Sequence, residues 1–196
     1  RFFFFFYIRK SISYYIDPEK KTDDHITINK DNKKYTVISH NMHFSENLKN
    51  IRGTYRKFDG SKTASIVYPF KSIDFIDYEN NKILSVGPRN EGELFLIRSL
   101  GFRWKNISSI DLISYSNLTE LGDIHKSKYL DNSFDIIVCG WVLPYSNNYE
   151  KTLEELLRIT KNKGIISIGF SYIPRAVDKV REYDDKTIIL DSTEQI

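Results

Sequence analysis

The sequence has almost no cysteine, and this scarcity excludes two classes of small protein. The single cysteine, Cys139, cannot form an internal disulfide and cannot build a cysteine-rich zinc site. It lies within an apolar run, so we expect a small buried hydrophobic residue there. A chain without internal disulfides fits a reducing compartment, and we expect a cytoplasmic location.

A membrane-spanning run and a strong excess of one charge are also missing. The apolar run Phe2–Ile8 is far shorter than the roughly 20 residues that cross a bilayer. We therefore expect no membrane span, and a buried strand or helix start at this run. The 29 basic and 26 acidic residues give a net charge of +3 and are scattered along the chain, so we expect no nucleic-acid partner. His40 and His43 lack an evident third ligand, and we expect no metal site.

The length of 196 residues suits one domain with an attached segment. We place an N-terminal extension, a substrate lid or cap, at residues 1–80 and the main domain at residues 81–196. Alternating apolar residues around a polar turn at Lys30–Lys33 predict a short hairpin in the extension, and residues 45–52 form a weak helix candidate. Because the chain starts without methionine and stops just after an apolar run, we expect a fragment or a processed product.

From Lys82 onward, strand-length apolar runs alternate with helical or loop segments. The predicted strands are Ile83–Val86, Ile107–Ile110, Phe134–Cys139, Ile165–Phe170 and Thr187–Leu190. Helical spacing predicts helices at Glu93–Leu100 and at Asn147–Thr160, and Gly164 is expected to end the second helix. Strands buried on both faces and joined by helical crossovers indicate an α/β fold: a doubly wound, mainly parallel, Rossmann-like sheet.

The segment Lys82–Gly92 is the centre of this pattern, because a short strand there runs into a glycine turn that opens a helix. Such a turn is how α/β domains bind a nucleotide-like ligand. Asp111 ends the second strand, where an acid lies beside the first turn and binds a ribose hydroxyl pair. Asp123 is expected at the tip of a further strand between Ile107–Ile110 and Phe134–Cys139, the third of the sheet, where it can meet an adenine amino group. The fourth strand ends at Gly140-Trp141 on the same edge.

The order and spacing of four segments resemble the class I S-adenosylmethionine-dependent methyltransferases. These segments, within about residues 80–172, are ILSVGPRNEGE, SSIDL, LGDIHKSKYLDNSFDIIVCGWVLPYS and LEELLRITKNKGIISIG. The resemblance implies S-adenosylmethionine as the cofactor. It implies that Gly87 lets the backbone approach the methionine part, that Asp111 holds the ribose and that Gly140 lies under the methionine end. Leu112, Asp123 and Ile124 are expected to border the adenine.

The turn after the first strand departs from the family pattern. Ser85 stands where the family usually has an acid, and Arg89 and Glu91 stand where it usually has glycines. Pro88 fixes one dihedral angle and is expected to stiffen the turn. We assign Pro88 and Arg89 to the cofactor site, with Arg89 pairing either with the cofactor carboxylate or with a neighbouring glutamate.

Methyl transfer in this family is an in-line displacement at a sulfonium methyl, so the protein mainly positions the reactants. If the acceptor is a hydroxyl or a protonated amine, the candidate general bases are His125, Tyr145 and Asp123. His125 is a lone histidine in a loop, and we expect it to be solvated. Trp141 and Tyr145 follow the fourth strand and are candidate acceptor contacts, with core or rim packing as the alternative.

The sequence therefore predicts an enzyme that methylates a small-molecule, sugar or lipid-linked acceptor. One alternative is another nucleotide-binding enzyme, such as a nicotinamide-dependent dehydrogenase, although the pattern G-x-G-x-x-G is absent. The other alternative is a non-catalytic binding module that keeps the sheet. The acceptor and the oligomeric state are left open at this point.

Overall fold

The computed structural model of the chain describes residues 9–14, 25–30, 33–38, 61–88, 90–146 and 148–170. In chain order the strands are β1 (Arg9–Tyr14), β2 (His25–Lys30), β3 (Lys33–Ile38), β4 (Ile83–Val86), β5 (Ile107–Asp111), β6 (Ile113–Ser116), β7 (Glu120–Leu121), β8 (Phe134–Gly140) and β9 (Thr160–Gly169). The α-helices are α3 (Ser61–Val67), α4 (Glu91–Ser99) and α5 (Tyr149–Ile159). The 3-10 helices are η1 (Tyr68–Ser72), η2 (Trp104–Asn106), η3 (Ile124–Lys126) and η4 (Leu143–Tyr145).

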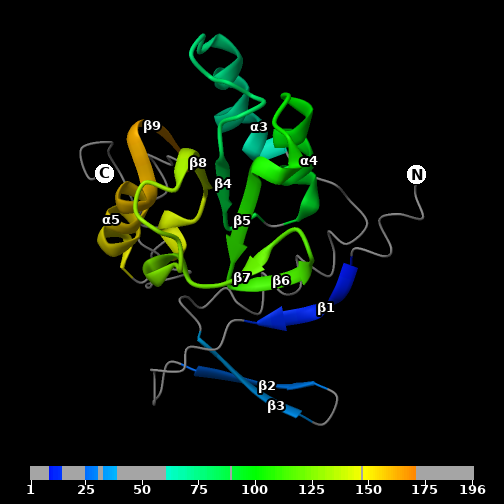
Figure 1. Cartoon of the computed structure of the whole chain (residues 1–196). Coiled ribbons are helices and arrows are strands. Elements are labelled where there is room, and N and C mark those ends of the chain that lie inside the picture. The colour runs from blue at the N-terminus through cyan, green and yellow to red at the C-terminus, as the bar shows by residue number, and fades with distance from the viewer. Residues whose placement is uncertain are drawn as a thin grey trace, which may run out of the picture.

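Five strands form one parallel sheet in the order β7-β5-β4-β8-β9 (Figure 1). The chain starts in the centre at β4, moves outward to β5 and β7, and then crosses back to β8 and β9. This reversal confirms the predicted doubly wound α/β fold. The predicted strand Thr187–Leu190 lies outside the described residues. The predicted hairpin in the extension is present as the antiparallel pair β2-β3.

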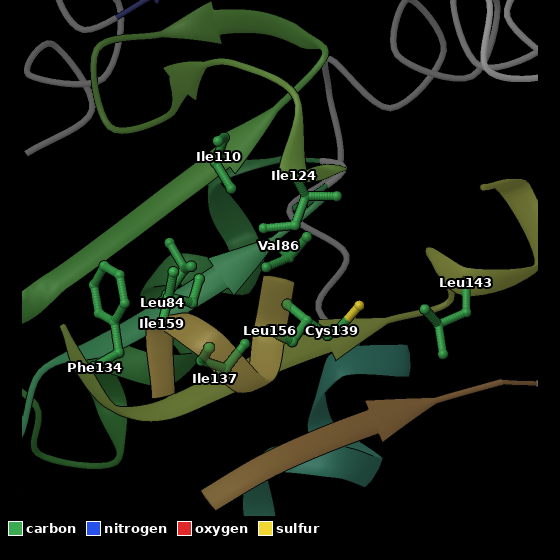
Figure 2. Packing of buried hydrophobic residues seen from close by; sticks show 10 residues of the cluster. All are labelled: Leu84, Val86, Ile110, Ile124, Phe134, Ile137, Cys139, Leu143, Leu156 and Ile159. Carbon is green, nitrogen blue, oxygen red and sulfur yellow. The ribbon is translucent and has the colours of Figure 1, made fainter. Parts of the chain in front are cut away.

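Alternate residues of β4 face two separate cores, which explains why this strand has no polar face. Leu84 and Val86 pack with Leu156 and Ile159 of α5 on one face of the sheet (Figure 2). Ile83 packs on the other face, in a core shared with α3, η1 and α4. A central parallel strand covered on both sides in this way reads as a continuous apolar run, and Ile83–Val86 is buried throughout.

The segment just before β4 belongs to the second of these cores. Val67 at the end of α3, Phe70 in η1 and Ile76 are buried there with Ile83. Ser167 of β9 donates a hydrogen bond of 2.7 Å to the backbone oxygen of Ile66 in α3. Residues 61–76, which the sequence reasoning placed in the extension, thus pack directly on the sheet. The domain boundary near residue 80 stays a prediction.

The predicted glycine end of the helix before β9 is wrong. The C-cap of α5 is Thr160, whose backbone is extended, and β9 begins at that same residue. Gly164 lies inside β9, next to Lys163 with its φ of +63°. A Cβ at Gly164 would lie 2.8 Å from the backbone oxygen of Asp135. The glycine is therefore needed where two strands approach closely, and it does not cap the helix.

One strand pairing was not predicted from the sequence. β6 follows β5 after a single residue and pairs antiparallel with β1 in a separate two-stranded sheet. The alternation of larger residues with serine over Ile113–Ser116 is the period-two signal that could have indicated this strand. Its partner lies about a hundred residues earlier in the chain, so local patterning could not identify it.

Three predicted features fall on residues that the structure does not describe: the apolar run Phe2–Ile8, the helix candidate at residues 45–52 and the histidines His40 and His43. Among the residues that it does describe, no three histidine, cysteine or acidic side chains come together as a metal site. No helix within the described ranges is long and apolar enough to cross a membrane.

The buried position of Cys139 leads to a first testable prediction. Its side chain is fully buried in β8, and burial raises the pKa of the thiol to about 12. Burial therefore keeps the thiol protonated near neutral pH, and the thiolate is the reactive form. We expect iodoacetamide to leave the native chain unmodified over an hour and to add one carbamidomethyl group in 8 M urea, as read by intact mass. Rapid modification of the native chain would contradict the burial of Cys139.

Candidate functional site

The turn after β4 lies against the segment that follows β8. Gly87 has a φ of +65°, and its N–H donates a hydrogen bond of 2.8 Å to the backbone oxygen of Ile110. A Cβ at Gly87 would lie 2.4 Å from Cγ2 of Val142, so both conformation and space favour glycine. Pro88 is buried directly after it. Arg89, the next residue assigned to this turn, lies outside the described residues.

The helix after this turn begins two residues before the predicted start. Asn90 is buried and extended, and its side chain accepts a hydrogen bond of 2.8 Å from the N–H of Gly92. This is an N-cap, and asparagine followed by acids in the first turn is its sequence signature. The first turn contains Glu91, which is buried, and Glu93, whose carboxylate accepts a 2.5 Å hydrogen bond from Thr63 of α3.

Asp111 ends β5 at the same edge of the sheet. Its strand is the parallel neighbour of β4, with Val86 opposite Ile110, so Asp111 lies close to the Gly87 turn. The side chain is partly buried and accepts a hydrogen bond of 3.1 Å from the N–H of Ile113. A carboxylate can accept about four hydrogen bonds, so this bond is compatible with further acceptance from a hydroxyl pair. Leu112 follows and is partly buried.

Asp123 and His125 form a buried pair just after β7. The Asp123 carboxylate accepts hydrogen bonds from the backbone N–H of His125 at 2.9 Å and from its ring Nδ1 at 2.7 Å. On the other side of the ring, Nε2 lies 2.6 Å from Oγ of Ser146. The prediction of a solvated His125 is therefore wrong, because this side chain is only 9% exposed. Ile124 between them is buried in the core on the α5 side of the sheet.

Sequence reasoning missed Ser146 because its role depends on a contact across 21 residues. Ser146 is buried, and its Oγ lies 3.1 Å from Oγ1 of Thr152 in α5. The N–H of Asn148 also donates to Ser146, at 3.1 Å. Nothing in the local sequence around Leu143–Ser146 indicates a histidine partner.

The end of β8 carries a non-glycine residue in the left-handed conformation. Trp141 has a φ of +57°, and its N–H donates a hydrogen bond of 2.6 Å to the backbone oxygen of Gly169 at the end of β9. Its ring lies over Gly169, where a Cβ would come within 2.9 Å of Cζ3. A bulky residue at positive φ stores backbone strain, and such residues cluster at functional sites.

The space beside Gly140 is taken by Ile66, whose Cδ1 would lie 3.1 Å from a Cβ there.

Tyr145 lies in the short 3-10 helix that follows Trp141. Its side chain is 37% exposed, and its N–H donates to the backbone oxygen of Val142 at 2.9 Å. The turn after β4, the acids after β5 and β7, and the aromatic residues after β8 therefore all lie at the carboxyl end of one parallel sheet. That edge, at the point where the strand order reverses, is where open α/β sheets bind their ligands.

Comparisons with known proteins show what this arrangement resembles. Residues 105–168 match a family model described as a methyltransferase domain. This segment runs from just before β5 into β9, so it includes both acids and the aromatic residues after β8. No curated protein sequence matches the chain.

Among solved structures, the YcgJ protein from Bacillus subtilis is 18% identical, with a TM-score of 0.54, and the match covers 68% of this chain and 64% of that one. This chain therefore spans less than two thirds of that protein. A candidate S-adenosyl-L-methionine-dependent methyltransferase from Methanococcus maripaludis is 17% identical, with a TM-score of 0.51 and coverage of 75% and 78%.

A chain from the complex between the Haloferax volcanii Trm112 methyltransferase activator and a candidate methyltransferase is 15% identical, with a TM-score of 0.56 and coverage of 75% and 68%. At these identities the likeness of the solved structures concerns the fold. The family match adds a likeness to a methyltransferase domain over residues 105–168. Residues 105–168 therefore resemble a methyltransferase domain, and the chain shares its fold with these solved structures.

Proposed function

We propose that this protein transfers the methyl group of S-adenosylmethionine to a small-molecule, sugar or lipid-linked acceptor. The observation that carries the proposal is the position of Asp111 beside the Gly87 turn, at the carboxyl edge where the strand order reverses. When bound, S-adenosylmethionine supplies a reactive methyl group together with its own leaving group. The protein then has to bind, orient and desolvate the two reactants.

The residues present fit this cofactor in their chemistry. Asp111 accepts hydrogen bonds from the ribose hydroxyls, and Leu112 provides an apolar contact for the adenine. Asp123 and Ile124 border the adenine from the end of β7. Gly87, Pro88 and Gly140 are the proposed residues on the methionine side. Arg89, which lies outside the described residues, is assigned to the same site from the sequence.

The acids in the first turn of α4 support a cofactor without phosphates. A dinucleotide places its pyrophosphate at the N-terminus of the helix after the first strand. Glu91 and Glu93 occupy that turn and would repel a pyrophosphate. S-adenosylmethionine carries a positive sulfonium, an ammonium and a single carboxylate, and no phosphate, so the same acids oppose it less. This argument favours the methyl donor over a nicotinamide cofactor.

Trp141 and Tyr145 are the proposed acceptor contacts. Trp141 follows the central strand β8 in a strained conformation, which the chain maintains against a cost of about 1–3 kcal/mol. Tyr145 lies nearby in sequence and is partly exposed. Tyr145 is also the proposed general base for a hydroxyl or protonated amine, since both ring nitrogens of His125 already have side-chain partners.

Replacing Trp141 with alanine tests the acceptor site. We expect kcat/KM for the acceptor to fall at least about fivefold, because a buried aromatic contact contributes on the order of 1 kcal/mol or more. The Kd for S-adenosylmethionine is expected to stay within about threefold. The measurement is transfer of tritium from methyl-labelled S-adenosylmethionine into water-soluble and lipid fractions of a cell extract. The labelled product is then identified, and kinetics are measured with the corresponding unmethylated acceptor.

Trp104→Ala is the matched control for this experiment. Trp104 is 39% exposed and packs edge-on against Phe95, with ring centroids 5.2 Å apart, just before β5 at the opposite edge of the sheet. We expect this variant to keep full transfer. Equal loss in both variants would contradict an acceptor role for Trp141. If labelled methyl enters neither fraction although S-adenosylmethionine binds, the chain is a non-catalytic binding module or acts on a macromolecule.

A further inference from the structure

Four buried polar side chains form a continuous row that links the end of β7 to the start of α5. The row runs from Asp123 through His125 and Ser146 to Thr152, with successive separations of 2.7, 2.6 and 3.1 Å. These side chains are 4%, 9%, 5% and 0% exposed, respectively. The methyl-transfer chemistry described above uses only Asp123 from this row, so the other three side chains need an explanation.

The hydrogen-bonding partners assign the proton positions within the row. An ionised carboxylate can only accept, so Nδ1 of His125 carries a proton and donates it to Asp123. In the neutral ring Nε2 then accepts the hydroxyl proton of Ser146. Ser146 in turn accepts from the N–H of Asn148. Every member of the row thus satisfies its neighbour, which is the condition under which a buried polar network becomes rigid.

The two ends of the row lie at functionally different places. Asp123 follows β7, where the proposed function puts the adenine. Ser146 follows Trp141 and Tyr145, the proposed acceptor contacts. Asn148 also caps α5 by accepting from the N–H of Lys151 at 2.9 Å, so the far end of the row is anchored on a helix. Within this row, His125 joins the two sides.

We propose that His125 is a positioning residue that holds the Asp123 carboxylate in the orientation that binds the adenine. The inference rests on the proposed function. The hydrogen bond from Nδ1 and the one from the backbone N–H of His125 both fix the same oxygen, Oδ1 of Asp123. This leaves the carboxylate one defined orientation. The bond between Nε2 and Ser146 keeps the imidazole in the required tautomer and rotamer.

Two amide substitutions at His125 separate its two roles. Asparagine places its amide nitrogen near the position of Nδ1, so His125→Asn keeps the donor to Asp123 and loses the hydrogen bond to Ser146. Glutamine places its amide near the position of Nε2, so His125→Gln keeps the hydrogen bond to Ser146 and loses the donor to Asp123. Each variant removes one of two buried hydrogen bonds, and we expect similar decreases in melting temperature.

The test is the Kd for S-adenosylmethionine of the unaltered chain and both variants, measured by calorimetry alongside their melting temperatures. The inference predicts a Kd within about threefold of the unaltered value for His125→Asn and at least about tenfold higher for His125→Gln. Equal changes in Kd would show a merely structural role and overturn the inference. If the unaltered chain does not bind S-adenosylmethionine, the proposed function fails, and this inference fails with it.

A second measurement on the unaltered chain covers the case in which a variant does not fold. In ¹⁵N-labelled protein, the ring of His125 is expected to show a protonated Nδ1 and an unprotonated Nε2. Saturation with S-adenosylmethionine should shift these ring signals without changing the tautomer. Ring signals that stay unmoved at saturation, or a proton on Nε2 alone, would overturn the inference.

Discussion

Replacing Asp111 with alanine is expected to raise the Kd for S-adenosylmethionine by at least about 100-fold. The variant would lose the acceptor for two ribose hydroxyls. Hydrogen bonds to a charged group contribute about 1.5–3 kcal/mol each, and about 1.4 kcal/mol corresponds to a tenfold change in affinity. The measurement is isothermal titration calorimetry, with thermal unfolding of each variant recorded in parallel.

Asp111→Asn is the control that separates binding from local folding. Asparagine keeps an oxygen that can accept from the N–H of Ile113, as Asp111 does at 3.1 Å. It loses the charge and half of the acceptor capacity, so we expect an intermediate Kd, raised about tenfold. An alanine variant that binds as tightly as the unaltered chain would remove Asp111 from the cofactor site.

The second large effect is expected at Gly164, where alanine should lower the free energy of unfolding by about 3 kcal/mol. The added Cβ would lie 2.6 Å from Cγ2 of Thr160 and 2.8 and 2.9 Å from the backbone oxygens of Asp135 and Lys161. Two of these three neighbours are backbone atoms, so the strands themselves must move. Overpacking of this kind costs about 1–3 kcal/mol or more. Urea denaturation followed by far-UV circular dichroism measures the change.

The neighbouring residue supplies the control for this prediction. Lys163 is exposed and has a φ of +63°, a conformation that glycine adopts without steric cost. We expect Lys163→Gly to leave stability unchanged or to raise it by up to about 1 kcal/mol. If the free energy of unfolding of Gly164→Ala lies within about 0.5 kcal/mol of that of the unaltered chain, β8 and β9 do not approach as closely as the structure describes.

Most strands of the parallel sheet could be predicted because buried strands leave local patterns in the sequence. Apolar runs such as Ile83–Val86 mark strands that are buried on both faces, and their alternation with helical segments indicates parallel pairing. Asp111 stands directly after such a run and Asp123 follows the short strand β7, so the topology brings both acids to one edge. The start of α4 was missed by two residues because the capping role of Asn90 was overlooked.

The remaining errors come from contacts between distant parts of the chain. The local sequence around His125 indicates an exposed loop residue. In the structure, Oγ of Ser146, 21 residues later, lies 2.6 Å from Nε2 of its ring. The local sequence around Gly164 indicates the end of a helix. In the structure, Gly164 lies in a strand that passes close to the backbone of Asp135. The pairing of β6 with β1 joins segments about a hundred residues apart. None of these contacts leaves a signal in local composition or periodicity.

The central claim is that the edge around Gly87 and Asp111 binds S-adenosylmethionine in spite of the altered glycine turn. Calorimetric titration of the unaltered chain with S-adenosylmethionine, and separately with NADH, tests it most directly. We predict saturable binding of one S-adenosylmethionine per chain, with a Kd between about 1 μM and 1 mM, and no binding of NADH. Binding of NADH without binding of S-adenosylmethionine would contradict the account.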